Sequence, residues 1–89
     1  MEGRVYDDKY KEFRRKVFAR DGHKCQMPGC KSRSKKFEIH HILKWAKFPS
    51  LRYDPKNGIV LHKTCHKKIK NKEDIYAPMF AEIVYRNSR

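Results

Sequence analysis

Two short segments of this chain carry four side chains that suit a single zinc ion: Cys25 and Cys30, then His62 and Cys65. Three thiolates and one imidazole form a ligand set typical of structural zinc. The chain has 89 residues, a little above the roughly 70–80 residues below which a single hydrophobic core supplies only about 3–5 kcal/mol. We therefore expect a zinc site that clamps the two segments together, the alternative being three unrelated buried thiols. The odd number of cysteines argues against a complete disulfide framework and favours a reducing compartment.

The charge of the chain is strongly and unevenly positive. It has 23 Lys and Arg against 10 Asp and Glu, a net charge of +13. Residues 1–36 and 37–72 each carry +7, whereas residues 73–89 carry −1. A field of this kind attracts polyanions, and a phosphate backbone is the commonest one inside a cell. Nucleic-acid binding is therefore expected, the alternative being a solvated basic surface.

The chain shows no feature that predicts a membrane location. No stretch approaches the ~18 apolar residues that span a bilayer, and the N-terminus lacks a signal-peptide core. We therefore expect a cytoplasmic protein without a membrane partner.

Apolar spacing predicts a helix over about residues 8–20, where Tyr10, Phe13, Val17 and Phe18 form one stripe. Asp7 or Asp8 is a suitable N-cap, and Asp21-Gly22 a suitable stop. The other face of this helix either contacts phosphates or faces water; it carries Lys11, Arg14, Arg15 and Lys16.

The rest of the chain predicts a small α+β domain that spans residues 1–89. Residues 37–43 and 58–61 are expected to be strands, antiparallel if the loop between them folds back, and a helix is expected from residue 63 to about 70. A last helix is expected over about residues 78–86, with Pro78 in its first turn. Its apolar face packs on the domain or forms a dimer interface, and we favour packing; this face comprises Met79, Phe80, Ile83 and Val84.

A second group of polar side chains indicates catalysis: His40, His41, Asn57 and His66. One histidine can bind a divalent cation while another, held through its second ring nitrogen by an acceptor, takes a proton from water. Adjacent histidines in a strand point to opposite faces, so the strand must end or twist here for both to serve one site. The alternative is a set of core or surface histidines without a joint role.

These residues and their spacing resemble the HNH endonuclease motif of the ββα-metal nucleases over residues 25–70. The paired Cys and His-Cys ligands resemble the zinc pairs of many phage and bacterial members, and residues 13–22 resemble the helix that precedes the motif. The resemblance implies a ββα-metal, treble-clef-like fold with structural zinc.

The resemblance also implies roles for individual residues. His41 is similar to the general base, His40 and His66 to ligands of a catalytic metal, and Asn57 to the residue that holds the loop and orients the base. A supporting role for Glu38 is implied more weakly. Two positions depart from the family pattern. His62 stands where many members have Cys, and Lys70 stands where the colicin-type nucleases have a further metal-binding His. The catalytic site is therefore expected to be open, with magnesium, manganese or nickel as its ion.

The implied activity is hydrolysis of DNA to 5′-phosphate and 3′-hydroxyl ends by a monomer or weak homodimer, alone or in a phage or restriction assembly. Trp45, Phe48 and Tyr53 either stack on bases or form local core, and we favour core. Two alternatives are a non-catalytic zinc module that binds nucleic acid and a nuclease subunit that is active only with a partner. Backbone contacts are expected from Lys35, Lys36, Lys44, Lys47, Arg52, Lys56, Lys63 and Lys67.

Overall fold

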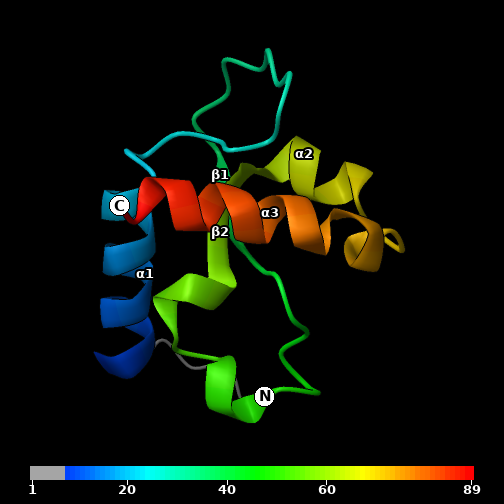
Figure 1. Cartoon of the computed structure of the whole chain (residues 1–89). Helices are drawn as coiled ribbons and strands as arrows, with labels where there is room; N and C mark the ends of the chain where they lie inside the picture. The colour runs from blue at the N-terminus through cyan, green and yellow to red at the C-terminus, as the bar shows by residue number, and fades with distance from the viewer. Residues whose placement is uncertain (1–7) are drawn as a thin grey trace.

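A two-stranded antiparallel sheet lies at the centre of the molecule, with helices on both of its faces (Figure 1). The structure is a computed structural model that describes residues 8–89. The order of elements agrees with the sequence prediction and has two additional short 3₁₀ turns. The elements are α1 (Asp8–Arg20), β1 (Phe37–His41), η1 (Pro49–Leu51), η2 (Pro55–Asn57), β2 (Gly58–His62), α2 (Lys63–Lys68) and α3 (Glu73–Asn87).

Helix α1 has the predicted bounds, and a Schellman motif ends it. Gly22 and His23 both adopt left-handed backbone angles, with φ of 64° and 57°. The His23 amide donates to the Phe18 carbonyl at 2.9 Å, and the Gly22 amide donates to the Ala19 carbonyl at 3.3 Å. These two bonds satisfy carbonyls that the last turn would otherwise leave unpaired. The predicted stop at Asp21-Gly22 is thus confirmed, whereas the alternative N-cap Asp7 lies outside the described residues.

The strands pair in a register that places Phe37 opposite His62 and His41 opposite Gly58. All five residues of β2 are buried, because α1 covers one face of the strand while α2 and α3 cover the other. A strand covered on both faces has an almost continuous apolar sequence, which explains the run Gly58-Ile59-Val60-Leu61.

Strand β1 ends at His41, two residues earlier than predicted, because Asn57 takes over its hydrogen bonds. The Asn57 carbonyl accepts from the Ile42 amide at 2.8 Å. The Asn57 side chain then accepts from the Leu43 amide at 2.8 Å and donates to the Leu43 carbonyl at 3.1 Å. A side-chain amide thus replaces a strand partner, and the chain can turn away immediately after His41.

Two apolar clusters hold the helices on the sheet. Val60 packs with Phe13 and Val17 of α1 on one face. On the other face the cluster joins the sheet to α2 and α3; it contains Ile42, Ile59, Leu61, Cys65, Ile69, Phe80, Ile83 and Val84. Gly58 allows Phe13 of α1 to approach the backbone of β2 closely, because a Cβ at position 58 would lie 2.8 Å from Phe13 Cζ.

Helix α3 begins at Glu73, so the prediction of a helix over about residues 78–86 was wrong at its start. Pro78 lies inside the helix and not in its first turn; it has no N–H to donate to the Asp74 carbonyl. The helix begins early enough to include Tyr76, whose ring stacks on Phe80 at a centroid distance of 5.7 Å. The expected packing of this apolar face on the domain is confirmed. Helix α2 ends two residues before the expected residue 70.

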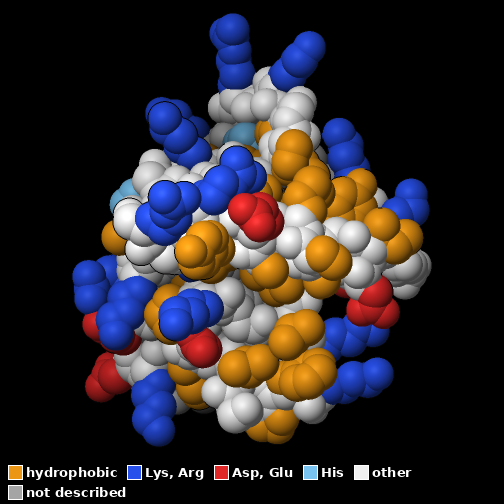
Figure 2. Space-filling model, in the orientation of Figure 1, with side chains coloured by type: hydrophobic (Ala, Val, Ile, Leu, Met, Phe, Trp, Pro, Cys, Tyr) orange, Lys and Arg blue, Asp and Glu red, His pale blue; other side chains and the backbone are white. Residues whose placement is uncertain are grey.

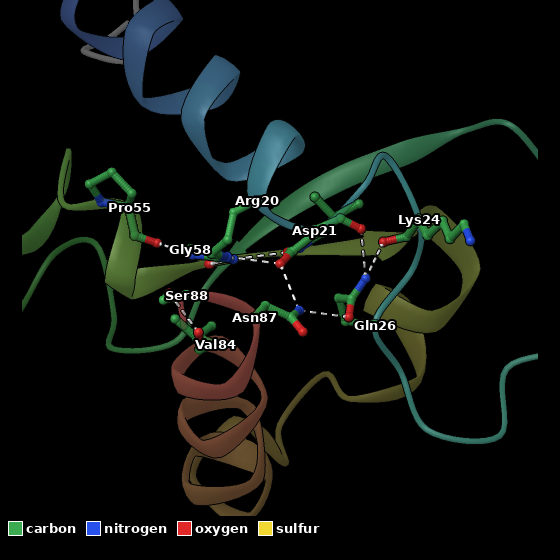
Figure 3. A network of polar contacts seen from close by, with 10 residues as sticks. Arg20, Asp21, Lys24, Gln26, Pro55, Gly58, Val84, Asn87 and Ser88 are labelled. Carbon is green, nitrogen blue, oxygen red and sulfur yellow. Dashed lines mark hydrogen bonds and ion pairs between the residues drawn. The ribbon is translucent and has the colours of Figure 1, made fainter.

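A buried polar network fastens the end of α1 to the rest of the domain (Figure 3). The Arg20 and Asp21 side chains form two hydrogen bonds at 2.8 and 2.9 Å, and they are only 10% and 0% exposed. Arg20 also donates to the Pro55 and Gly58 carbonyls, each at 2.6 Å. The Asp21 carboxylate accepts from the Val60 amide at 3.0 Å.

The same carboxylate reaches the last helix. Asn87 donates to Asp21 at 3.1 Å and to the Gln26 side chain at 3.0 Å (Figure 3). Gln26 in turn donates to the carbonyls of Asp21 and Lys24. One buried carboxylate therefore joins α1, β2 and α3, and Asn87 connects it to Gln26 in the loop that carries the first cysteine.

We expect Asp21→Ala to lower the free energy of unfolding by about 3–5 kcal/mol, because it leaves the buried Arg20 charge uncompensated. Urea denaturation of the zinc-loaded protein, followed by circular dichroism, measures this change. The control is Glu82→Ala, which removes an exposed carboxylate 3.9 Å from Arg86 and should change stability by no more than about 0.5 kcal/mol. An Asp21→Ala variant as stable as the control would contradict the role given to the network.

Candidate active site and metal centre

The four predicted zinc ligands come together at one end of the sheet. The potential ligand atoms of Cys25, Cys30, His62 and Cys65 all lie within 4.8 Å of one another. Ligands at about 2.3 Å from a tetrahedral ion are separated by about 3.7 Å, so the cluster fits zinc. The loop after α1 supplies two cysteines, the end of β2 supplies the histidine, and the first turn of α2 supplies Cys65.

The ring of His62 is oriented so that its Nδ1 can bind a zinc ion held by the cysteines. Its Nε2–H donates to the Ser34 carbonyl at 2.8 Å, and its Nδ1 lies 3.1 Å from Cys30 Sγ. A metal-bound histidine commonly donates its second ring N–H to a carbonyl in this way, which fixes the tautomer. The ring also stacks on Phe37 at a centroid distance of 4.9 Å. These contacts turn Nδ1 toward the sulfurs.

The thiols of the cluster differ in acidity. A hydrogen bond from the Ser32 backbone lowers the pKa of Cys30 to about 7. Burial raises the pKa of Cys65 to about 12, and its Sγ–H donates to Cys30 Sγ at 3.3 Å. Zinc binding would replace this thiol proton, since the metal takes thiolate ligands.

A second group of polar side chains, His40, His66 and Glu38, lies on the side of the sheet that faces α2 and α3. His40 Nδ1 lies 3.3 Å from His66 Nε2, although the two residues come from β1 and α2. Glu38 accepts from His66 Nδ1 at 2.7 Å, so the lone pair of His66 is on Nε2 and points toward His40. Two cis ligands on an ion bound at about 2.1 Å are about 3 Å apart. The pair therefore fits a shared divalent cation.

His40 is held neutral by its surroundings. Its side chain is buried and packs edge-on against Phe80 at a centroid distance of 5.5 Å. Burial, and then electrostatic repulsion from the neighbouring His66 imidazole when both rings take up a proton, lower the pKa of His40 to about 4. A neutral imidazole has the lone pair that metal binding requires. Its Nε2 has no hydrogen-bond partner among the described residues.

His41 points to the opposite face of the strand, as the sequence argument requires for adjacent residues. Its ring stacks on Phe13 and meets the edge of Trp45, both at a centroid distance of 5.1 Å. Nε2–H donates to the Arg52 carbonyl at 3.0 Å, so the neutral ring has its lone pair on Nδ1. His40 and His41 are the last two residues of β1, and their side chains lie on opposite faces of the strand.

Asn57 holds the loop that carries this carbonyl. It is buried, bonds to Leu43 as described above, and donates to the Leu51 carbonyl at 3.3 Å. Leu51 directly precedes Arg52, whose carbonyl orients His41. The Asn57 amide thus fixes both ends of the loop around His41.

The predicted basic contacts are exposed, with the exception of Arg52, which is half-buried. Arg52 donates to the Trp45 carbonyl at 2.8 Å, and its guanidinium lies 4.8 Å from the centre of the Trp45 ring. Lys63 and Lys67 line a hollow of about 210 Å³ with Glu38 and His66. The other predicted contacts lie elsewhere on the surface; they are Lys35, Lys36, Lys44, Lys47 and Lys56.

The loop aromatics form less core than predicted. Trp45 is half-buried between His41 and Tyr53, but Phe48 is 39% exposed and Tyr53 is 37% exposed. The prediction of local core was therefore wrong for Phe48 and Tyr53: α3 contacts the later part of this loop, at Pro55–Asn57, and both rings stay outside the two apolar clusters.

Sequence reasoning missed several groups that position the site. The Ser34 and Arg52 carbonyls orient His62 and His41, and a backbone carbonyl has no signature in residue type. The sequence pattern marks Asp21 only as part of a helix stop. Asp21 follows Arg20 directly and precedes Gly22, and this adjacency of opposite charges at a helix end is the signal that could indicate a buried ion pair.

Comparisons with known proteins agree with this geometry. The family model described as HNH endonuclease matches residues 24–72, more than half of the chain. Neither the curated proteins nor the solved structures include a significant match. Within residues 8–89, none of the helices has the length and apolar character needed to cross a membrane. The fold, the Cys/His cluster and the family match together show that this chain belongs to the HNH endonuclease family, with a ββα-metal fold.

Proposed function

We propose that this chain is a metal-dependent DNA endonuclease that nicks one strand. The observation that carries the proposal is the 3.3 Å approach of His40 Nδ1 to His66 Nε2; His41 adjoins His40 in the chain, at the end of β1, and faces the other side of the strand. A non-catalytic zinc module needs only the four ligands of the Cys/His cluster. A zinc-binding role alone does not explain why the imidazoles of His40 and His66 converge, or why Glu38 accepts a hydrogen bond from His66.

His41 is the proposed general base. Its Nε2–H donates to the Arg52 carbonyl, so Nδ1 is the nitrogen that accepts a proton from the attacking water. The water oxygen forms a bond to phosphorus as the bond from phosphorus to the 3′ oxygen breaks. The products are a 5′-phosphate and, after the leaving oxygen takes a proton from solvent, a 3′-hydroxyl.

His40 and His66 are the proposed ligands of the catalytic ion, with Glu38 as the positioning residue behind His66. When bound, magnesium, manganese or nickel supplies positive charge beside the scissile phosphate and the leaving oxygen. With Lys at position 70, two protein ligands leave the remaining coordination positions to water and phosphate. Lys70 lines the same hollow as His66, where it adds positive charge for the DNA backbone.

The proposed substrate is DNA, bound through the exposed lysines near His66 and around the loop after β1. One set of catalytic residues cuts one strand, so a monomer gives nicks and a double-strand cut requires two copies or a larger assembly. Phosphate contacts of this kind position the backbone without reading its sequence.

Relaxation of supercoiled plasmid tests the proposal. The zinc-loaded protein is assayed with magnesium, manganese, nickel or no added metal, and the ends are analysed by ligation and by phosphatase-dependent labelling. We expect metal-dependent open-circular product whose nicks DNA ligase seals, because ligase needs a 5′-phosphate beside a 3′-hydroxyl. Protein that binds plasmid but leaves it supercoiled with all three metals would contradict the proposal.

A further inference from the structure

A basic and aromatic groove lies along the outer face of α1, away from the histidines of the proposed active site. Lys11, Arg14, Arg15 and Phe18 follow at helical spacing and therefore share one face. Together with His23 they line a groove of about 380 Å³. The Schellman motif places His23 at the end of this face, where its ring lies 5.6 Å from that of Phe18.

The groove continues into a second hollow beneath the loop before β1. His23 lines both, and the second hollow, of about 510 Å³, has Lys24, Arg33 and Lys35 around the zinc ligands. Phe37 also lines it, and its ring meets Phe18 edge-on at 6.4 Å. Figure 2 shows Lys and Arg side chains standing out over α1 and from this loop. Aromatic rings thus run between two groups of cations.

The cations of this face are only partly neutralised. Among residues 8–89, neither Lys11 nor Arg14 has a carboxylate within ion-pair distance, whereas Arg15 and Lys16 share Glu12. The Arg14 guanidinium lies instead over the Phe18 ring, 4.6 Å from its centre. A positive charge that stacks on an aromatic ring remains available to a phosphate and gives a base a flat surface to stack on.

We propose that this groove binds a single-stranded segment of nucleic acid, with phosphates on Lys11, Arg14 and Lys35 and unpaired bases against Phe18 and Phe37. The inference rests on the proposed function, since the ligand is a strand of the nuclease's substrate. The face from Lys11 to Phe18 is roughly 10 Å long, which corresponds to about three nucleotides of one strand. Bases within a duplex stack on each other and cannot reach these rings, so the groove distinguishes unpaired from paired DNA.

Fluorescence anisotropy tests the proposal without cleavage. The zinc-loaded His41→Ala protein, in buffer without magnesium, is titrated into labelled oligothymidylate of about a dozen nucleotides and, separately, into a labelled hairpin duplex. We expect Phe18→Leu to weaken binding of the single strand about tenfold and to leave duplex binding within about twofold. Leucine retains most of the apolar volume, so the packing of Phe18 beside Val60 is largely kept.

The double variant Lys11→Ala/Arg14→Ala tests the phosphate contacts. We expect it to weaken single-strand binding and to reduce the slope of log affinity against log salt by about 1.4, since each phosphate contact contributes about 0.7. The matched control is Lys68→Ala/Lys72→Ala, which removes the same charge from exposed positions on α2 and before α3, at the other side of the molecule (Figure 1). It should bind the single strand within about twofold of the parent.

Two results would overturn the proposal. One is unchanged single-strand binding by Lys11→Ala/Arg14→Ala, a test that stands even if Phe18→Leu loses zinc. The other is a folded, zinc-replete Phe18→Leu that loses duplex and single-strand binding equally. Failure of the proposed function looks different: plasmid stays supercoiled with every metal, while single-strand binding still depends on Lys11 and Arg14.

Discussion

Cys65→Ser is expected to abolish the cooperative thermal transition of this chain and its stoichiometric zinc. Cys65 is buried within the larger apolar cluster, and it also belongs to the Cys/His cluster that fits zinc. The ion is therefore expected to hold the loop after α1 against β2 and α2. Structural zinc contributes an apparent binding free energy of about 10–16 kcal/mol at neutral pH, which is as large as the total stability of about 5–15 kcal/mol of an ordinary domain.

Zinc content by mass spectrometry and far-ultraviolet circular dichroism during heating measure this effect. The matched control is Thr64→Ser, an exposed neighbour on the same helix, which should retain zinc and the melting temperature of the parent. Chelation of the parent protein should reproduce the loss, and added zinc, but not magnesium, should reverse it. A Cys65→Ser protein with full zinc and an unchanged transition would show that the cluster does not hold the fold.

His41→Ala is expected to reduce the rate of plasmid nicking by a factor of about 10²–10⁴, the usual contribution of a positioned general base. The ring is fixed by its bond to the Arg52 carbonyl and by contacts with Phe13 and Trp45, so its base nitrogen is held in one orientation, and the alanine variant loses that positioned base. Initial rates of open-circle formation, at saturating metal, give the measurement.

Because His41 packs between two aromatic rings, a loss of activity must be separated from a loss of folding. The variant should contain one zinc per chain and bind plasmid within about threefold of the parent, since His41 contributes no net charge when neutral. His41→Gln, which fills more of the space but is a poor base, should be as inactive as His41→Ala. A folded His41→Ala protein that nicks at the parental rate would remove His41 from the proposed mechanism.

The sequence predicted those parts of the molecule whose signal is local. Helix α1 follows from the spacing of Phe13 and Val17 and from Gly22 after it, and the zinc cluster follows from the chemistry of Cys and His at short spacing. The strand pair follows from two short apolar runs on either side of a loop rich in turn residues. Each of these inferences needs only residue type and separation along the chain.

The errors arose where tertiary contacts override a local preference. Pro78 favours the first turn of a helix, but Tyr76 and Ala77 pack against the larger apolar cluster, and the helix begins at Glu73 so as to include them. The end of β1 depends on Asn57, which is far away in sequence and acts through its side-chain amide. The orientation of His41 depends on a carbonyl of the Leu51–Arg52 segment, and no residue pattern marks that oxygen.

The hydrogen bond from Asn87 to Asp21 joins two residues that are made far apart in time during synthesis, and this affects the order in which the domain folds. All four residues of the Cys/His cluster have been made once Cys65 leaves the ribosome, before α3 exists. The Asp21 carboxylate receives its last side-chain donor only when Asn87 has been added. A nascent chain can therefore assemble the Cys/His cluster before it has made the helix that closes the larger apolar cluster and satisfies the buried carboxylate.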